Sequence, residues 1–196
     1  MAAKRAIDRT DILPPETYSA ERKALREKVI AVKRHRRMEV GPFATFYFEN
    51  YDTMWQQVQE MLYIERGGEE QIADELAAYN PLIPKGSELV ATFMIEIDDP
   101  EKRKRMLSRL GGIEATAFIQ IGMEKIPCRA EEDQDRTSAE GKASSVQFVH
   151  FPFTRAQIEA FRQSGAPVIV GLSHENYGHM AVLPEPVRAE LAKDFG

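Results

Sequence analysis

The sequence predicts one α+β (or α/β) domain, in which a mixed β-sheet of about five to six strands is covered by helices. The chain has 196 residues, the length of one ordinary domain, so we expect residues 1–196 to fold as a single unit. Hydrophobic residues make up 43 % and charged residues 29 %, a balance typical of a protein that buries a core. Strand-like and helix-like patterns alternate along the chain, which supports this fold class.

The first third of the chain shows helical periodicity on both sides of an aromatic, β-branched segment. Leu25, Val29 and Val32 recur at helical spacing, and Gly41-Pro42 ends that helix because proline blocks its continuation. The segment FATFYFEN that follows is typical of a strand. The expected elements are a helix over 16–37, a strand over 43–50, a helix from 52 or 53 to about 66, and a helix over about 69–79.

Alternation of apolar and polar residues predicts two strands in the middle of the chain. In SELVATFMIEI, the apolar side chains from Leu89 to Ile97 share one face. Asp99-Pro100-Glu101 predicts a helix start, with an acidic cap, a proline in the first turn and an acid at the positive end of the helix dipole. The expected elements are a strand over 87–97, a helix from 100 to the glycines at 111–112, and a strand over 113–123.

The last third of the chain predicts further strands that alternate with helices. Residues 145–153 are apolar on both faces, which indicates a central strand. Thr154 and Gln157 have the spacing of a capping box. Residues 129–145 are polar without an apolar period, so we expect a mobile, exposed loop there. The remaining elements are a helix over 155–163, strands over 168–172 and 179–183, and a helix that starts in 184–186 and runs to about 194.

The net charge of −5 is unevenly distributed. Residues 1–40 hold 11 Lys/Arg and 6 Asp/Glu, which leaves a net charge of −10 on the rest of the chain. We interpret residues 1–40 as a basic N-terminal helical arm, which can bind nucleic acid or an anionic partner. The interleaved acids and the acidic total disfavour nucleic acid and favour a helix with a charged solvent face. The candidate partner-binding residues are Arg34, Arg36, Arg37 and Trp55.

The composition also indicates a soluble chain in a reducing compartment. Cys128 is the only cysteine, so no internal disulfide can form. No stretch approaches the roughly 18 apolar residues of a membrane-spanning helix. The N-terminal segment MAAKRAIDRTDILPP lacks the apolar core of a secretion signal. We therefore expect a cytoplasmic protein that does not insert into a membrane.

The segment SHENYGH, Ser173 to His179, is the main candidate site. It lies between two expected strands, so we interpret it as a hairpin connection in which Gly178 supplies an unusual backbone angle. The two histidines would then flank the turn at cross-strand distance, where they could share a divalent metal or provide a general base. The candidate metal ligands are His150, His174 and His179, and the candidate catalytic residues are His174, His179 and Glu175.

Simpler interpretations of the polar residues stay open. SHENYGH can be an ordinary polar turn, because Ser, Asn, Gly and His are common turn residues. Glu96 and Glu114 could form an acid–base or cation site if their strands were neighbours, with Glu49 at the end of the first strand, but a solvated sheet face explains such acids as well. Nucleotide-binding glycine fingerprints, phosphate loops, cysteine zinc knuckles and nucleophile elbows are absent from the sequence.

The order of several motifs resembles a bacterial family of unknown function, number 3501. The matching segments cover nearly the whole chain and include RRMEVGPFATFYFEN, YNPLIPKGSELVAT, VQFVHFPFTRAQIEAFR and VIVGLSHENYGH. The family has no assigned activity. Its members tend to be encoded near rubrerythrin-like and iron–sulfur proteins, so the resemblance implies a setting of oxidative stress or electron transfer. It implies no iron in this chain, since the cluster ligands would be absent.

The sequence leaves three functional hypotheses. The first is a cytoplasmic, non-catalytic accessory or binding protein that contacts a redox or iron–sulfur partner through the basic arm and the Trp55 helix. The second is a metal-binding protein or enzyme centred on the SHENYGH hairpin. The third is nucleic-acid binding by the basic arm. The sequence does not determine the oligomeric state, and a homo-oligomer is compatible with it.

Overall fold

The structure, a computed structural model, describes residues 4–130, 138, 141–163 and 165–196. Within these residues the chain forms helices and two antiparallel sheets, one of five strands and one of four. The predicted α+β class is confirmed. The chain builds two facing sheets where one mixed sheet was expected. A strand with one apolar face has the same sequence pattern in either arrangement, which explains the difference.

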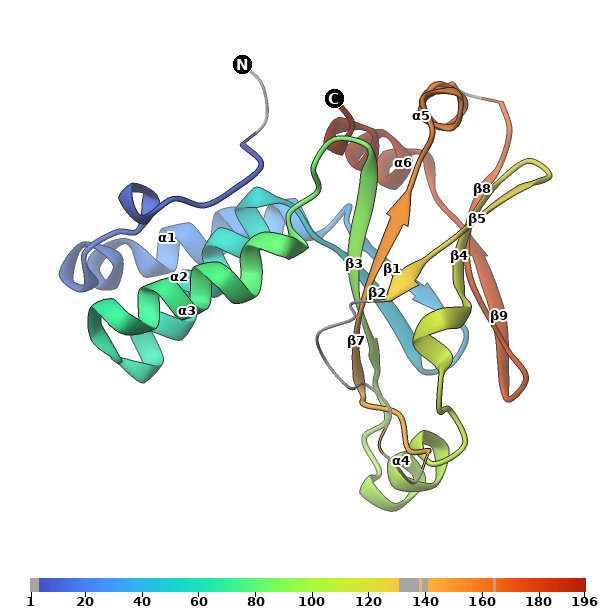
Figure 1. Cartoon of the computed structure of the whole chain (residues 1–196), viewed down its shortest axis with the longest axis horizontal. Helices are drawn as coiled ribbons and strands as arrows, with labels where there is room; N and C mark the ends of the chain where they lie inside the picture. Colours follow the sequence, from blue (N-terminus) through green and yellow to red (C-terminus); the bar gives the residue numbers. More distant parts are fainter. Residues whose placement is uncertain (1–3, 131–137, 139–140, 164) are drawn as a thin grey trace.

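The larger sheet lies at the centre of the molecule (Figure 1). Phe46 of β2 is paired with Phe93 of β3, and their rings stack with centroids 5.0 Å apart. The first strand was not predicted, because its residues continue the charged pattern of the preceding helix. Met38 and Val40 are nevertheless buried there. The strand order is β1 (Arg37–Val40), β2 (Ala44–Phe48), β3 (Glu88–Ile95), β7 (Val146–Pro152) and β6 (Arg129–Ala130).

The smaller sheet packs against the inner face of the larger one. Ile119 and Val170 are paired in this sheet and are fully buried in the same apolar core as Phe93. At the margins β9 lies beside β1 and β5 lies beside β7, so the two sheets enclose that core. The predicted strand over 113–123 begins as a 3-10 turn, η3 (Ile113–Thr116). The strand order is β5 (Glu124–Pro127), β4 (Ala117–Ile121), β8 (Val168–His174) and β9 (Tyr177–Val182).

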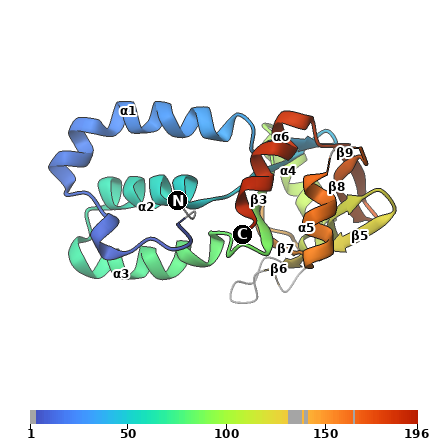
Figure 2. The same cartoon turned by 90° about the horizontal axis from the view of Figure 1, so that it is seen from above.

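Three helices form a separate layer that extends to one side of the sheets (Figure 1, Figure 2). The second of them is capped by Asn50, whose side chain accepts a hydrogen bond from the N–H of Thr53 at 3.0 Å, and it ends at Arg66 with a φ of 55°. Val58 packs with Val90, on the outer face of β3, in a second, smaller apolar core. The helices are α1 (Pro15–Lys33), α2 (Tyr51–Glu65) and α3 (Gly68–Tyr79).

The remaining α-helices lie at the two ends of the sheet pair, whereas η1 and η2 contact α3 in the helical layer (Figure 1). The predicted helix starts are present: Asp99 Oδ1 accepts from the N–H of Lys102 at 2.6 Å, and Thr154 and Gln157 form the capping box. The last two helices and the C-terminus lie at the end opposite α4. The bounds are α4 (Pro100–Leu107), α5 (Arg155–Arg162), α6 (Glu185–Leu191), η1 (Arg9–Asp11), η2 (Asn80–Leu82) and η4 (Ala192–Asp194).

The basic N-terminal helix packs along α2. Arg22 donates to the carboxylate of Glu60 with distances of 2.9 and 2.7 Å, so part of the basic charge lies inside the helical layer. The loop expected over 129–145 begins with β6, which pairs with β7. Residues 131–137 and 139–140 of that loop lie outside the described residues. Within the described part of the chain, no helix is both long enough and apolar enough to cross a membrane.

Candidate functional site

The predicted histidine hairpin forms, but its register separates the two imidazoles. β8 and β9 are joined by residues 175–176. His174 is paired with Tyr177, and His179 is paired with Leu172. The two histidines are therefore diagonal neighbours on the hairpin, and each faces a different residue across the strands.

His174 is held by hydrogen bonds through both ring nitrogens. Nδ1 accepts from the backbone N–H of Asn176 at 3.1 Å, and Nε2 lies 3.2 Å from the carbonyl oxygen of Gly111. Because a carbonyl only accepts hydrogen bonds, the hydrogen bond to Gly111 requires the proton on Nε2. In this arrangement both nitrogens already have partners, which leaves neither for a metal ion.

The other residues of the turn have ordinary structural roles. Gly178 is paired with Ser173 inside β9, and its φ is not positive, so the unusual backbone angle expected there was wrong. Glu175 is exposed at the turn, where its Oε1 accepts from the side-chain amide of Asn176 at 3.3 Å. These contacts support the polar-turn interpretation of this segment.

His179 and Tyr177 hold the turn between β1 and β2. Their rings meet edge to face with centroids 4.5 Å apart. The Tyr177 hydroxyl donates to the carbonyl of Val40 at 2.8 Å and accepts from the N–H of Phe43 at 2.8 Å. Gly41 between them has a φ of 71°, and a Cβ there would lie 2.5 Å from the His179 ring, so the turn needs glycine at this position.

His150 lies in the other sheet, on β7. Its Nδ1 is 3.0 Å from Oε2 of Glu88. Burial opposes ionisation of Glu88, but the hydrogen bond and charge of His150 and the contacts with Lys85 together outweigh it, so the pKa of Glu88 lies below its ordinary value. Among the described residues, no group of three or more His, Cys, Asp or Glu side chains could hold a metal ion. The structure does not bring His150 together with His174 and His179 as one ligand set.

The candidate carboxylates are also separated. Glu49 is buried, and its two oxygens accept hydrogen bonds from the hydroxyls of Thr53 at 2.6 Å and Thr92 at 2.8 Å. Glu96 follows β3 and Glu114 precedes β4. Because these strands belong to different sheets, the neighbouring-strand arrangement that the two acids needed does not occur.

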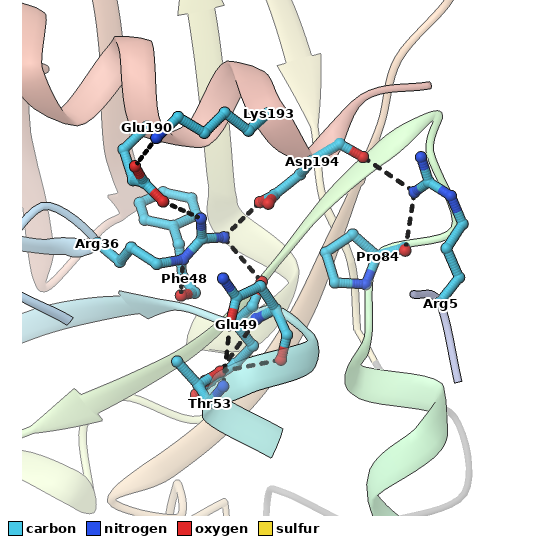
Figure 3. A network of polar contacts seen from close by, with 10 residues as sticks. Arg5, Arg36, Phe48, Glu49, Thr53, Pro84, Glu190, Lys193 and Asp194 are labelled. Atoms are coloured by element: carbon cyan, nitrogen blue, oxygen red, sulfur yellow. Dashed lines mark hydrogen bonds and ion pairs between the residues drawn. The ribbon is translucent and has the colours of Figure 1, made fainter. Parts of the chain in front are cut away.

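Arg36, a candidate partner contact, is buried with 1 % of its surface exposed. Nε donates to the carbonyl of Phe48 at 2.9 Å, and Nη2 donates to the carbonyl of Glu49 at 3.0 Å and to the Asp194 carboxylate (Figure 3). Glu190 Oε1 lies 3.6 Å from Nη1. The guanidinium therefore joins the end of β2 to the C-terminal segment, and a partner cannot reach it in this fold.

The other candidate partner contacts differ in their exposure. Arg34 is exposed, and the exposed Arg37 lies over the ring of Tyr47 at 5.8 Å from its centroid. Trp55 is half-buried, and its Nε1 donates to the carbonyl of Asp11 at 2.9 Å. Trp55 therefore fixes the N-terminal segment against α2, while Arg34 and Arg37 are available at the surface.

That N-terminal segment forms one side of a cleft of about 770 Å³, whose other sides are α1, α2 and α3. This volume lies in the range of small-molecule sites. Two of the lining residues, Ile12 and Ile72, belong to the apolar core of the helical layer. The main apolar groups of the lining are Ile12, Leu13, Pro14, Leu62, Tyr63 and Ile72.

The α1 side of the cleft carries a buried polar network. The hydroxyl of Tyr18, which lines the cleft, donates to Glu60 Oε1 at 2.6 Å. Hydrogen bonds from Arg22 lower the pKa of Glu60 although burial opposes this. Burial and the Glu60 carboxylate together raise the pKa of Tyr18. Gln56 Nε2 also donates to Glu60 Oε1, at 3.1 Å, so these groups are committed to one another.

Gln59 of α2 also lines the cleft and has an unused donor. The residue is 2 % exposed, and its buried Nε2 has no hydrogen-bond partner among the described residues. A buried amide donor without an acceptor costs about 1–3 kcal/mol. At the rim, Arg9 and Glu69 neutralise each other through hydrogen bonds of 3.0 and 2.5 Å. The cleft thus combines apolar walls with a charged rim, which also carries the exposed Glu16 and Arg66.

Sequence reasoning missed this cleft. The periodicity of MWQQVQEMLYIE places Val58 and Leu62 on an apolar stripe and Gln59 on another face. Gln59 is buried in the helical layer, where α2 packs against both α1 and α3, and the contact with α1 joins segments that are distant in sequence. One sequence signal could have indicated a second buried face of this helix. It is the pair of glutamines at i and i+3, Gln56 and Gln59, on a helix that also carries an apolar stripe.

Comparison with solved structures and protein families gives a family but no activity. The chain is similar to a crystal structure described as a novel protein of unknown function from Burkholderia pseudomallei K96243, with 34 % identity and a TM-score of 0.90 over 97 % of this chain and 100 % of that chain. No curated protein matches the chain. The resemblance seen in the motifs is confirmed, because the model of the family described as protein of unknown function (DUF3501) matches residues 6–195, and the chain belongs to this family.

Proposed function

We propose that this chain is a non-catalytic binding protein that holds a small, mostly apolar molecule between α1, α2 and α3. The observation that carries the proposal is the cleft of about 770 Å³ with its apolar lining. The Tyr18 hydroxyl beside the cleft is bonded to Glu60, and its raised pKa makes it a poor nucleophile. This arrangement supports retention of a ligand over its chemical conversion.

We also propose that the ligand-binding chain acts as a cytoplasmic accessory protein beside a redox or iron–sulfur partner. The family resemblance and the single cysteine, Cys128, support this part of the proposal. The exposed Arg34 and Arg37 are the surface groups left for such a contact. The cleft proposal does not depend on this partner.

A tryptophan placed inside the cleft tests the proposal. Ser19 is an exposed residue of α1 that lines the cleft, so Ser19→Trp fills the cleft without entering the apolar core. Ala20→Trp is the matched control, because Ala20 is the next exposed residue of α1 and does not line the cleft. The probe is Nile red, a neutral apolar dye whose fluorescence rises in apolar surroundings.

We expect saturable, one-to-one Nile red binding to the unmodified protein and to the Ala20→Trp variant. Binding to the Ser19→Trp variant should be at least about tenfold weaker, because the indole takes the volume that the dye needs. Circular dichroism confirms that both variants are folded. Absence of saturable binding, or equal binding by the two variants, would overturn the proposal.

A further inference from the structure

We propose that the ligand is an amphipathic carboxylate, such as a fatty acid, whose apolar body lies in the cleft and whose head group is held by Lys23 and Arg26 of α1. This inference rests on the proposed function, because it needs a ligand in the cleft. It goes beyond apolar binding, since it names the charge of the ligand and the surface that recognises it.

The first argument is that the cleft adjoins a second hollow along α1. This second hollow has a volume of about 410 Å³. Ser19 and Tyr63 line both the cleft and the second hollow, so the two hollows share a boundary on the surface of the helical layer. A molecule that fills the apolar cleft can therefore extend past these two residues and place its head group in the second hollow.

The second argument is the charge of the second hollow. Its lining contains three cations, Arg22, Lys23 and Arg26, and one acid, Glu27. The lining of the cleft instead contains two arginines and two glutamates, so its charges balance. Because unlike charges attract, the excess of cations in the second hollow favours a negative head group there.

The third argument is that Lys23 and Arg26 are available to a ligand. Arg22 is committed to Glu60, to which it donates at 2.9 and 2.7 Å. Lys23 and Arg26 are exposed, and neither forms a side-chain hydrogen bond or an ion pair with any residue that the structure describes. Arg22 contributes most to the lowered pKa of Glu60 and the charge of Arg26 adds to it, so Arg26 lies within electrostatic reach of the network beside the cleft.

This assignment also gives a role to the basic N-terminal arm. Lys23 and Arg26 belong to the excess of cations in residues 1–40. The net charge of −10 on the rest of the chain opposes a polyanion such as nucleic acid. A single carboxylate needs only a local pair of cations, which this part of α1 provides.

Three competitors with the same alkyl chain test the inference. Decanoate, 1-decanol and decylammonium carry a negative, a neutral and a positive head group. Each displaces Nile red at pH 7.5 and low salt from the unmodified protein and from the Lys23→Gln, Arg26→Gln double variant. We expect the preference for decanoate over decylammonium, given as the ratio of their inhibition constants, to fall about tenfold in the double variant, while 1-decanol binds both proteins equally.

The Lys28→Gln, Lys33→Gln double variant is the matched control, because it removes the same charge from exposed residues of α1 that line neither hollow. Its ratio should stay within about twofold of that of the unmodified protein. Circular dichroism confirms that each variant is folded, and Arg26→Gln alone replaces the first double variant if that variant fails to fold. An unchanged ratio in the folded Arg26 variant, or an equal fall in the control, sinks this inference and leaves the proposed function standing, provided that Ser19→Trp still blocks Nile red. A protein that binds no Nile red overturns both.

Discussion

Arg36 and Asp194, which are 158 residues apart in the sequence, form a buried ion pair. The Arg36 side chain is 1 % exposed and that of Asp194 is 7 % exposed. Arg5 extends the contact, because its Nη1 donates to the carbonyl of Pro84 at 3.1 Å and to that of Asp194 at 3.0 Å (Figure 3). Two arginines from the N-terminal part of the chain therefore hold the C-terminal segment against the larger sheet.

Removing the Arg36 charge should strongly destabilise the fold. We expect Arg36→Met to lower the free energy of unfolding by about 3–5 kcal/mol, because it leaves the buried Asp194 carboxylate without its counter-ion. Arg34→Met is the control, since Arg34 is exposed and should change stability by about 0.5 kcal/mol or less. Urea unfolding at pH 7.5 measures both. Equal midpoints for the two variants would show that the buried pair contributes nothing.

The same pair gives the fold a pH dependence. Burial raises the pKa of Asp194 to about 6 from 3.8, although Arg36 opposes the shift. Between these two pH values the folded chain binds more protons than the unfolded chain, so this group's contribution to stability falls as the pH rises. The full contribution is about 3 kcal/mol, present below pH 3.8 and lost as the pH passes 6.

Asp194→Asn removes that titration. We expect the unfolding free energy of the unmodified protein, relative to this variant, to increase by up to about 3 kcal/mol as the pH is lowered from 7 to 4. Comparing the two proteins cancels the other carboxylates, such as Glu88, whose lowered pKa acts in the opposite direction. A difference that shrinks towards low pH would mean that the ion pair with Arg36 outweighs burial.

The sequence predicted those elements whose signals are local. The alternation in residues 87–97 predicted the strand that is present as β3. The capping pattern of Thr154 and Gln157 predicted the start of α5. β1 was missed because it has four residues, RMEV, too few to show a period after a charged helix. The division into two sheets was missed because it depends on which strands pair, and the strand pattern does not encode this.

The candidate site was harder to predict than the fold, for a related reason. The histidine motif suggested that His174 and His179 face each other across the hairpin. The register instead places Tyr177 opposite His174, so the two histidines are not a cross-strand pair. The sequence pattern of α2 did not distinguish Gln59 from a solvent-facing glutamine. Gln59 is buried where α2 packs between α1 and α3, and this packing is tertiary.

Cys128 should react slowly with thiol reagents. Burial raises the pKa of the Cys128 thiol to about 11, and its Sγ donates to the carbonyl of Glu114 at 3.0 Å. At pH 7.5 the reactive thiolate is therefore a very small fraction. We expect the reaction with Ellman's reagent to be at least about tenfold slower in the folded protein than in urea, where the thiol has its ordinary pKa. A fast reaction in the folded state would reopen a redox role for this residue.

Gln59 and Gln56 should respond in opposite ways when each is replaced by methionine in the ligand-free protein. Gln59→Met removes a buried donor that has no partner, so we expect the free energy of unfolding to rise by about 1–2 kcal/mol. Gln56→Met removes an unpartnered oxygen as well, but it also removes a donor that binds Tyr18 and Glu60, and the loss of these two hydrogen bonds should lower the free energy of unfolding by about 1 kcal/mol. Thermal and urea unfolding of the two variants measure these changes. If both variants lost stability, Gln59 Nε2 would already have an acceptor, such as a bound water.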